Sequence, residues 1–333
     1  MEAKKPAAQY KDFAPDVFPV SMDIVFRDEA GRATTLSYRK VEWTVDGQKR
    51  GLRYGENPDQ SAALYAPVGG NLSIADADLV LPSGDLVTTA ELLQFGKHPG
   101  KTNLTDVDSA LSILRYLDEQ PACAIMKHNN PSGVARADSI EEAYHQAYMA
   151  DRVAAFGGAV VLNRQLNREL ALAIADSYCE VVAAPDYGPG ALDVFAAKKN
   201  LRVMRLPGME KLGRYAPARN LDFKTLLDGG CIVQASFASA IRKAEDLLPA
   251  ETEHKGQKYS VRREPSAREI QDMLFGWAVE SAVTSNSVIY VKNGVTLGIG
   301  AGEQDRVGVA ILARDKAYRK LEDRLCWQRH GLA

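Results

Sequence analysis

The strongest constraint on the fold is an alternation of short apolar runs and amphipathic helical stretches between residues 105 and 205. Residues 122–126, 155–162 and 180–184 are apolar runs of strand length, bounded by glycine, proline or asparagine. Helical periodicity begins at Thr105, and Ser139 with Glu142 has the spacing of a capping box. This alternation predicts an α/β fold in which helices cover a sheet.

Strand and turn signals flank this region on both sides. We expect a loose arm at 1–20, then antiparallel strands at 22–26 and 34–45. Further on, the pattern predicts a strand at 231–235, a helix capped by Ser266, a hairpin with its turn at Asn293-Gly294, and a final helix at 306–324. The predicted division is an N-terminal arm and hairpin (1–48), a first lobe (49–215) and a second lobe (216–333).

Charge and composition exclude several classes of function. The 333 residues include 41 Lys and Arg against 43 Asp and Glu, a net charge of −2, which disfavours nucleic acid or an acidic membrane as a partner. No apolar stretch approaches about 18 residues, and the N-terminus lacks the apolar core of a signal peptide. The four cysteines form no CxxC pair, which is typical of reduced thiols. We therefore expect a cytoplasmic protein that does not cross a membrane.

The most informative motif is Lys127-His128, which ends the apolar run at 122–126 and precedes Asn-Asn-Pro-Ser-Gly, read as a turn. Ligands of open α/β sheets bind at the carboxyl ends of strands. A neutral histidine can remove a proton, and a lysine can stabilise an oxyanion or protonate a leaving nitrogen. The pair predicts acid–base group transfer onto an anionic small molecule, although a purely structural histidine is an equal alternative.

Other polar residues could complete such a site, and each has a structural alternative. Arg53-Tyr54 between glycines can grip an anion or form a surface turn. Glu180 opens an apolar run, where a carboxylate serves a site or a salt bridge. Lys199 can bind a phosphate or complement a helix dipole. The amides of Asn130 and Asn286 and the guanidinium of Arg306 are further candidates.

The sequence contains no HExxH motif, no zinc-deaminase signature, no Gly-x-Ser-x-Gly elbow and no phosphate-binding loop. Gly-Ile-Gly-Ala-Gly at 298–302 lacks the Rossmann spacing and follows a hairpin, so it predicts only a close backbone approach to a ligand or another chain. We therefore expect no metal, and group-transfer chemistry carried by side chains.

Five motifs taken together are specific to one family. They are Arg53-Tyr54-Gly55-Glu56-Asn57-Pro58, residues 127–133, Phe156-Gly157-Gly158, Ser285-Asn286-Ser287 and residues 298–306. In order and spacing, from about residue 50 to 325, the chain resembles the AICAR transformylase part of the bifunctional purine-biosynthesis protein. That part transfers a formyl group from 10-formyltetrahydrofolate to the 5-amino group of aminoimidazole carboxamide ribotide (AICAR).

The resemblance implies a role for each of the matching residues. His128 would be the general base and Lys127 the transition-state stabiliser. The implied nucleotide contacts are Arg53, Tyr54, Lys199, Asn130, Gly157, Glu180, Asn286 and Arg306, and the implied folate contact is Val307. It also implies a tandem pair of cytidine-deaminase-like α/β/α units without zinc, and sites shared across a homodimer.

Two departures from the family pattern qualify these expectations. The roughly 50 residues before the first motif leave no room for the IMP cyclohydrolase domain, so we expect a stand-alone formyltransferase without ring closure to IMP. Relatives continue beyond the last helix with an Asp-Ala-Phe-Phe-Pro-Phe-Arg-Asp segment that this sequence lacks. A truncated sequence, a second polypeptide supplying that segment, or a catalytically inert nucleotide-binding or assembly module are the open alternatives. A deaminase-like hydrolase is a weaker one.

Overall fold

A computed structural model describes residues 14–69, 72–74, 77–78 and 85–331. Most of the arm expected at 1–20 therefore lies outside the described residues. The largest sheet of the described chain has eight strands in the order β18-β19-β10-β9-β11-β12-β13-β8. Its strands are β8 (Glu91–Gln94), β9 (Ala122–Lys127), β10 (Asn130–Arg136), β11 (Ala159–Leu162), β12 (Val181–Ala184), β13 (Arg202–Arg205), β18 (Val288–Lys292) and β19 (Val295–Gly300). A mixed α/β fold is thus confirmed.

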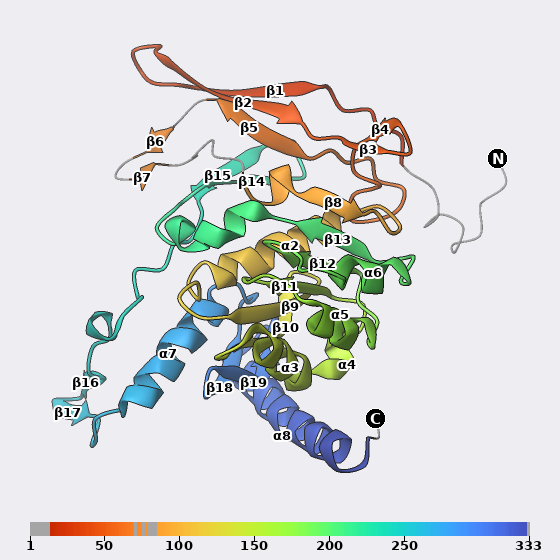
Figure 1. Cartoon of the computed structure of the whole chain (residues 1–333). Coiled ribbons are helices and arrows are strands. Elements are labelled where there is room, and N and C mark those ends of the chain that lie inside the picture. Colours follow the sequence, from red (N-terminus) through yellow and green to blue (C-terminus); the bar gives the residue numbers. More distant parts are fainter. Residues whose placement is uncertain (1–13, 70–71, 75–76, 79–84, 332–333) are drawn as a thin grey trace.

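Helices cover both faces of this sheet (Figure 1). One layer contains α2 (Lys101–Leu114) and α7 (Ala267–Glu280), and the other contains α3 (Ile140–Ala150), α5 (Arg168–Ala175) and α6 (Ala191–Ala196). Strand β9 shows the alternation that requires two layers, because Ala124 and Met126 pack in the α2 core while Cys123 and Ile125 pack in the α3 core. All of β9 except Lys127 is buried, as its apolar sequence predicts.

The strand directions decide which chain segments meet at one edge of the sheet. Strand β9 is antiparallel to both β10 and β11, whereas β11, β12 and β13 are parallel to one another. Met126 is opposite Ala159, Ala159 opposite Val181, and Val181 opposite Arg202. The carboxyl end of β9 therefore lies beside the amino ends of β11, β12 and β13. Of the strands that meet at this edge, β9 presents its carboxyl end, whereas β11, β12 and β13 present their amino ends.

Smaller sheets surround the central one. Strands β1 (Ser21–Arg27), β2 (Ala33–Lys40) and β5 (Tyr65–Gly69) form an antiparallel sheet. The predicted pairing of β1 with β2 is confirmed, but the strand predicted at 34–45 ends at Lys40, and residues 43–45 belong to a separate strand. Asp46 and Gly47, both with positive φ, turn β3 (Trp43–Val45) into β4 (Gln48–Arg50). The remaining pairs are β6 (Ser73–Ile74) with β7 (Ala77–Asp78), β14 (Leu221–Thr225) with β15 (Cys231–Ala235), and β16 (Glu251–His254) with β17 (Gln257–Ser260).

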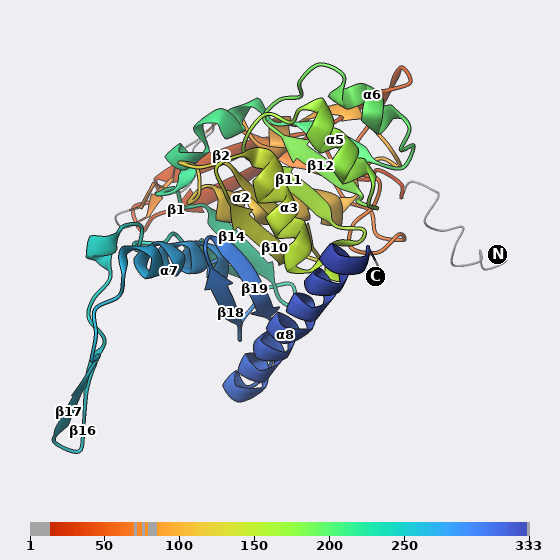
Figure 2. The same ribbon diagram turned by 60° about the horizontal axis from the view of Figure 1, so that its bottom comes forward.

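The C-terminal elements extend the central sheet and add a long helix. The hairpin β18–β19 pairs with β10, and α8 (Arg306–His330) packs on β19. Gly298 permits this contact, because a Cβ there would lie 2.3 Å from the carbonyl oxygen of Ala313. The close approach predicted for this glycine-rich segment is thus to a helix of the same chain. The β16–β17 hairpin projects away from the body of the molecule (Figure 2).

Short helical turns complete the described structure. The predicted start of α2 and the predicted end of α8 were wrong. The turns are η1 (Val87–Thr89), α4 (Arg152–Ala155), η2 (Pro207–Tyr215) and η3 (Ala244–Asp246). Helix α2 begins at Lys101 rather than Thr105, because Asn103 accepts a hydrogen bond from the Gly100 amide at its N-terminus (3.1 Å). Helix α8 continues to His330, six residues beyond the predicted end, and stops at left-handed Gly331.

Candidate functional site

Lys127 and His128 lie at a tight hairpin turn between β9 and β10. His128 and Asn129 both have left-handed backbone conformations, with φ of 54° and 61°. This is the geometry of a two-residue hairpin turn, which non-glycine residues adopt at a cost of about 1–2 kcal/mol each. The turn expected at Asn-Asn-Pro-Ser-Gly is displaced, because strand β10 already begins at Asn130. An irregular register between Pro131 and Gly133 accommodates the proline in the strand.

Four hydrogen bonds hold this turn from different sides. Lys127 Nζ donates to the carbonyl oxygen of Phe156 (2.8 Å), and the Asn129 amide donates to Asp106 Oδ1 on α2 (2.6 Å). Asn130 uses both ends of its side chain. Its Nδ2 donates to the His128 carbonyl (3.3 Å), and its Oδ1 accepts from the Thr284 amide (3.0 Å). The predicted amide of Asn130 thus joins the turn to the segment before β18.

Gly157 lies beside this turn, in the connection that leads into β11. Its φ of 75° favours glycine, and its amide donates to the Tyr178 carbonyl (2.8 Å). A Cβ at Gly157 would meet the Tyr178 ring at 3.4 Å. The neighbouring Phe156 ring lies 5.0 Å from that of Tyr178. Gly157 therefore places backbone without a side chain next to the Phe156 carbonyl, which accepts the hydrogen bond from Lys127.

Glu180 immediately precedes β12 and is partnered from two elements. Its Oε2 accepts from Asn103 Nδ2 on α2 (3.1 Å) and forms an ion pair with Arg202 Nη1 at the start of β13 (3.3 Å). The side chain of Glu180 is 38% exposed and that of Arg202 only 3%, so the buried member of the pair is the arginine. Burial lowers the pKa of Arg202, and Glu180 opposes that effect. The salt-bridge alternative for Glu180 is confirmed, and its carboxylate remains partly exposed to solvent.

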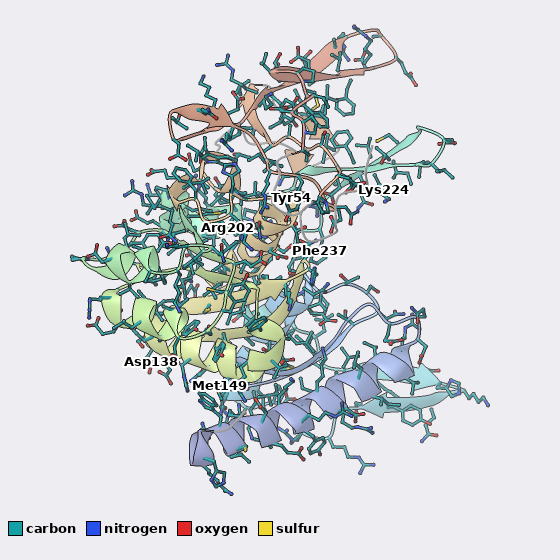
Figure 3. All side chains as sticks on the ribbon, turned by 90° about the vertical axis from the view of Figure 1, so that its right-hand side faces the viewer. Tyr54, Asp138, Met149, Arg202, Lys224 and Phe237 are labelled. Atoms are coloured by element: carbon teal, nitrogen blue, oxygen red, sulfur yellow. The ribbon has the colours of Figure 1, made fainter. Side chains whose placement is uncertain are left out.

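Arg53 and Tyr54 adjoin the same cluster. Arg53 is buried, which contradicts the alternative of a surface turn with a solvated guanidinium. Its amide donates to the Pro99 carbonyl (3.0 Å), and its guanidinium carbon lies 5.1 Å from the centre of the Tyr54 ring. Arg53 and Tyr54 both interact electrostatically with Arg202. Figure 3 shows Tyr54 and Arg202 in the same part of the molecule.

The remaining predicted residues occupy other segments. Both donors of the Asn286 side-chain amide are used within the chain, by the carbonyls of Glu303 and Gln304 (3.1 Å each). Arg306 and Val307 begin α8, and Val307 is 70% exposed. Lys199 is exposed in the loop before β13, on a cavity of about 320 Å³. Among the described residues, no hydrogen bond or ion pair joins Lys199, Arg306 or Val307 to the Lys127–His128 turn.

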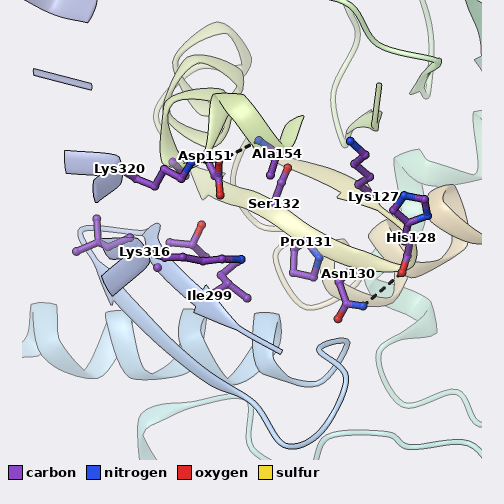
Figure 4. Close-up of a pocket in the computed structure, with 14 residues that line it drawn as sticks. Lys127, His128, Asn130, Pro131, Ser132, Asp151, Ala154, Ile299, Lys316 and Lys320 are labelled. Carbon is purple, nitrogen blue, oxygen red and sulfur yellow. Dashed lines mark hydrogen bonds and ion pairs between the residues drawn. The ribbon is translucent and has the colours of Figure 1, made fainter. Parts of the chain in front are cut away.

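A cavity of about 170 Å³ lies between the Lys127–His128 turn and α8 (Figure 4). Lys127 and His128 line one end, and Lys316 and Lys320 line the other. Lys320 is paired with the buried carboxylate of Asp151 (2.7 Å). The basic side chains outnumber the carboxylates, so the cavity suits an anionic small molecule.

Sequence reasoning missed three residues of this arrangement. Asn103, Asp106 and Arg202 contact Glu180 or the Lys127–His128 turn, and Asp106 and Arg202 are buried polar side chains. Two features of the sequence could have indicated them. Asp106 interrupts an otherwise apolar helical face, and Arg202 stands at the start of an apolar strand.

The described residues contain neither a cluster of metal-ligating side chains nor a membrane-spanning helix. No group of three or more His, Cys, Asp or Glu side chains is placed to hold a metal ion in the ranges that the structure describes. Within the same ranges, no helix combines the length and apolar character that a membrane span requires.

Comparison with known proteins identifies the family. Residues 21–316 match the family described as AICARFT/IMPCHase bienzyme. The chain is 38% identical over 273 residues to the bifunctional purine biosynthesis protein PurH of Roseobacter denitrificans, covering 81% of this chain and 46% of that protein. It is 34% identical over 294 residues to PurH of Halalkalibacterium halodurans, covering 88% and 50%. The chain thus spans about half the length of these relatives, and it belongs to the AICARFT/IMPCHase bienzyme family.

Proposed function

We propose that this chain transfers a formyl group from 10-formyltetrahydrofolate to the 5-amino group of AICAR. The observation that carries the proposal is the Lys127–His128 turn, fixed by hydrogen bonds at one edge of the central sheet and facing a cavity lined by basic residues. The family match supports the reaction, since its description and the names of the relatives refer to AICAR formyl transfer or purine biosynthesis. The reaction belongs to de novo purine biosynthesis.

His128 and Lys127 take complementary roles in this reaction. The AICAR amine attacks the formyl carbon, so a carbon–nitrogen bond to AICAR forms while the bond from that carbon to folate N10 breaks. The amine is a weak nucleophile because the ring carboxamide withdraws its lone pair. His128 removes its proton, and the Lys127 ammonium stabilises the oxyanion and supplies a proton to the departing nitrogen. No metal is needed for these steps.

The remaining residues of the proposed site would bind the two substrates. Buried Arg53 and its neighbour Tyr54 provide donors for the nucleotide phosphate, with Lys199 as a further cation. The nucleotide contacts proposed with them are Asn130, Gly157, Glu180, Asn286 and Arg306. Exposed Val307 contributes an apolar contact to the folate. These assignments rest on family resemblance, and the placement of Arg53, Asn130, Gly157 and Glu180 around one sheet edge supports them.

The proposal includes the assembly expected for this family. The chain contains tandem cytidine-deaminase-like α/β/α units without zinc, with a first lobe at 49–215 and a second at 216–333. It acts in the cytoplasm as a homodimer with shared sites, and a second polypeptide can supply further residues. The even balance of charge supports small-molecule partners rather than nucleic acid.

The decisive experiment is an assay of the purified, mass-verified chain with AICAR and 10-formyltetrahydrofolate, following release of tetrahydrofolate. His128→Ala should lower kcat by at least about 10²-fold, the usual contribution of a general base. His145→Ala, which removes an exposed histidine on α3, should leave it unchanged. Undiminished turnover in His128→Ala refutes the assignment. AICAR binding without any turnover, weakened by Arg53→Ala, supports an inert nucleotide-binding module instead.

A further inference from the structure

The hydrogen bond between Asp106 and the Asn129 amide has no role in the reaction as proposed so far. Asp106 is on the second turn of α2, and the residue is 6% exposed. Its Oδ1 lies 2.6 Å from the Asn129 amide nitrogen, across the boundary between helix and sheet. A buried carboxylate loses its hydration, which costs free energy unless a hydrogen bond replaces the lost water. The hydrogen bond to the Asn129 amide is such a replacement, and its position suggests a role for Asp106.

We infer that Asp106 is a positioning residue, whose carboxylate fixes the hairpin turn that presents Lys127 and His128. This inference rests on the proposed function for its catalytic consequence. Two consecutive left-handed residues other than glycine are unfavourable unless surrounding groups stabilise them. Asp106 supplies an acceptor to the second of these residues, inside the layer between α2 and β9.

The other contacts of the turn cannot replace this one. The Asn130 side-chain amide donates to the His128 carbonyl, and Lys127 Nζ donates to the Phe156 carbonyl, so neither of these contacts involves the Asn129 amide. The Asn129 amide points instead toward α2, where Asp106 receives it. Burial raises the pKa of Asp106, while the hydrogen bond from Asn129 and the proximity of His128 favour its ionised form.

Removal of the acceptor should loosen the turn without disturbing the helix. Asp106→Ala and Asp106→Leu both remove it, and leucine keeps the same branching of heavy atoms. Asp106→Asn keeps an acceptor oxygen. We expect the first two to lower kcat at least ten-fold with a KM for AICAR within two-fold of the unmodified chain, and Asp106→Asn to recover most of the loss.

Hydrogen–deuterium exchange of the full chain provides a readout independent of activity. In Asp106→Ala and Asp106→Leu, amides of the turn at 127–130 should exchange at least ten-fold faster, while the rest of α2 keeps its protection. Asp106→Asn should protect the turn, and Glu119→Ala, an exposed carboxylate after α2, should change nothing. If Asp106→Ala fails to fold, Asp106→Leu decides the question.

Three results would overturn the inference: an unchanged turn in both acceptor-free variants, faster exchange throughout α2, or a loosened turn with normal kcat. Failure of the proposed function is separate, because it appears as absence of formyl transfer in the unmodified chain. In that case the exchange of residues 127–130 still decides whether Asp106 anchors the turn.

Discussion

Gly133 on β10 packs tightly against α3, and its replacement by alanine tests the packing that supports the site. A Cβ at this position would lie 2.0 Å from the Ala147 carbonyl oxygen and 2.9 Å from the Ala150 Cβ. Real Cβ atoms do not approach other atoms closer than 3.0 Å, so α3 or β10 must move by about 1 Å. Close-packed interiors resist such a shift.

We expect Gly133→Ala to lower the free energy of unfolding by at least about 3 kcal/mol, the upper part of the range for overpacked cores. For a chain of this length that is a decrease in Tm of about 4 °C. The closest clash is with a backbone carbonyl, which no side-chain change can remove. Gly133→Ala combined with Ala150→Gly should therefore remain destabilised.

Urea unfolding followed by circular dichroism measures both variants. Gly69→Ala is the matched control, because a Cβ there meets nothing within 4 Å, and it should stay within about 0.5 kcal/mol of the unmodified chain. A Gly133→Ala variant of unchanged stability, or complete rescue by Ala150→Gly, would refute the packing argument.

Two further predictions concern the buried side chain of His98 and the contact between Arg152 and α8. Burial lowers the pKa of His98 below 6.5 in the folded chain, so the unfolded chain binds an extra proton at low pH. Stability should fall as the pH drops below about 6.5. His98→Gln should flatten that part of the urea-unfolding profile, and an identical slope in both chains would contradict the assignment. Arg152 makes two hydrogen bonds to Asp323 (2.8 and 2.9 Å) and lies over the Trp327 ring. Arg152→Ala should cost about 2 kcal/mol and speed proteolysis within residues 320–330, whereas uniform loss of protection along the chain would count against a local role.

The elements of the central layer could largely be predicted from the sequence. The apolar runs of β9 and β12 and the capping boxes at Ser139 and Ser266 are local signals, because adjacent residues make the contacts that they predict. One of the two hydrogen bonds of the capping box predicted at Ser139 is confirmed: the serine Oγ accepts from the Glu142 amide (3.2 Å). Turns such as Asn293-Gly294 are equally local, since positive φ at both positions selects these residue types.

Long-range contacts were the part that the sequence could not provide. Cys231 lies in an apolar run, yet β15 pairs only with β14 among the described strands and is exposed along its length. Glu180 opens an apolar run, but the buried member of its ion pair is Arg202, 22 residues later. Burial depends on which layers cover a strand, and composition within the strand does not determine this.

The direction of β9 explains why the candidate site could be recognised from motifs but not assembled from them. A parallel β9 would place Lys127 at the sheet edge opposite to Glu180 and Arg202, whereas the antiparallel pairing with β11 places all three at one edge. The hairpin makes β10 antiparallel to β9, and it requires left-handed backbone at His128 and Asn129. The turn that carries the proposed catalytic pair therefore reverses the chain at the same edge of the sheet where Glu180 and Arg202 lie, because β9 is also antiparallel to β11. That second pairing joins strands separated by β10 and α3, so motifs within a few residues of Lys127 do not reveal it.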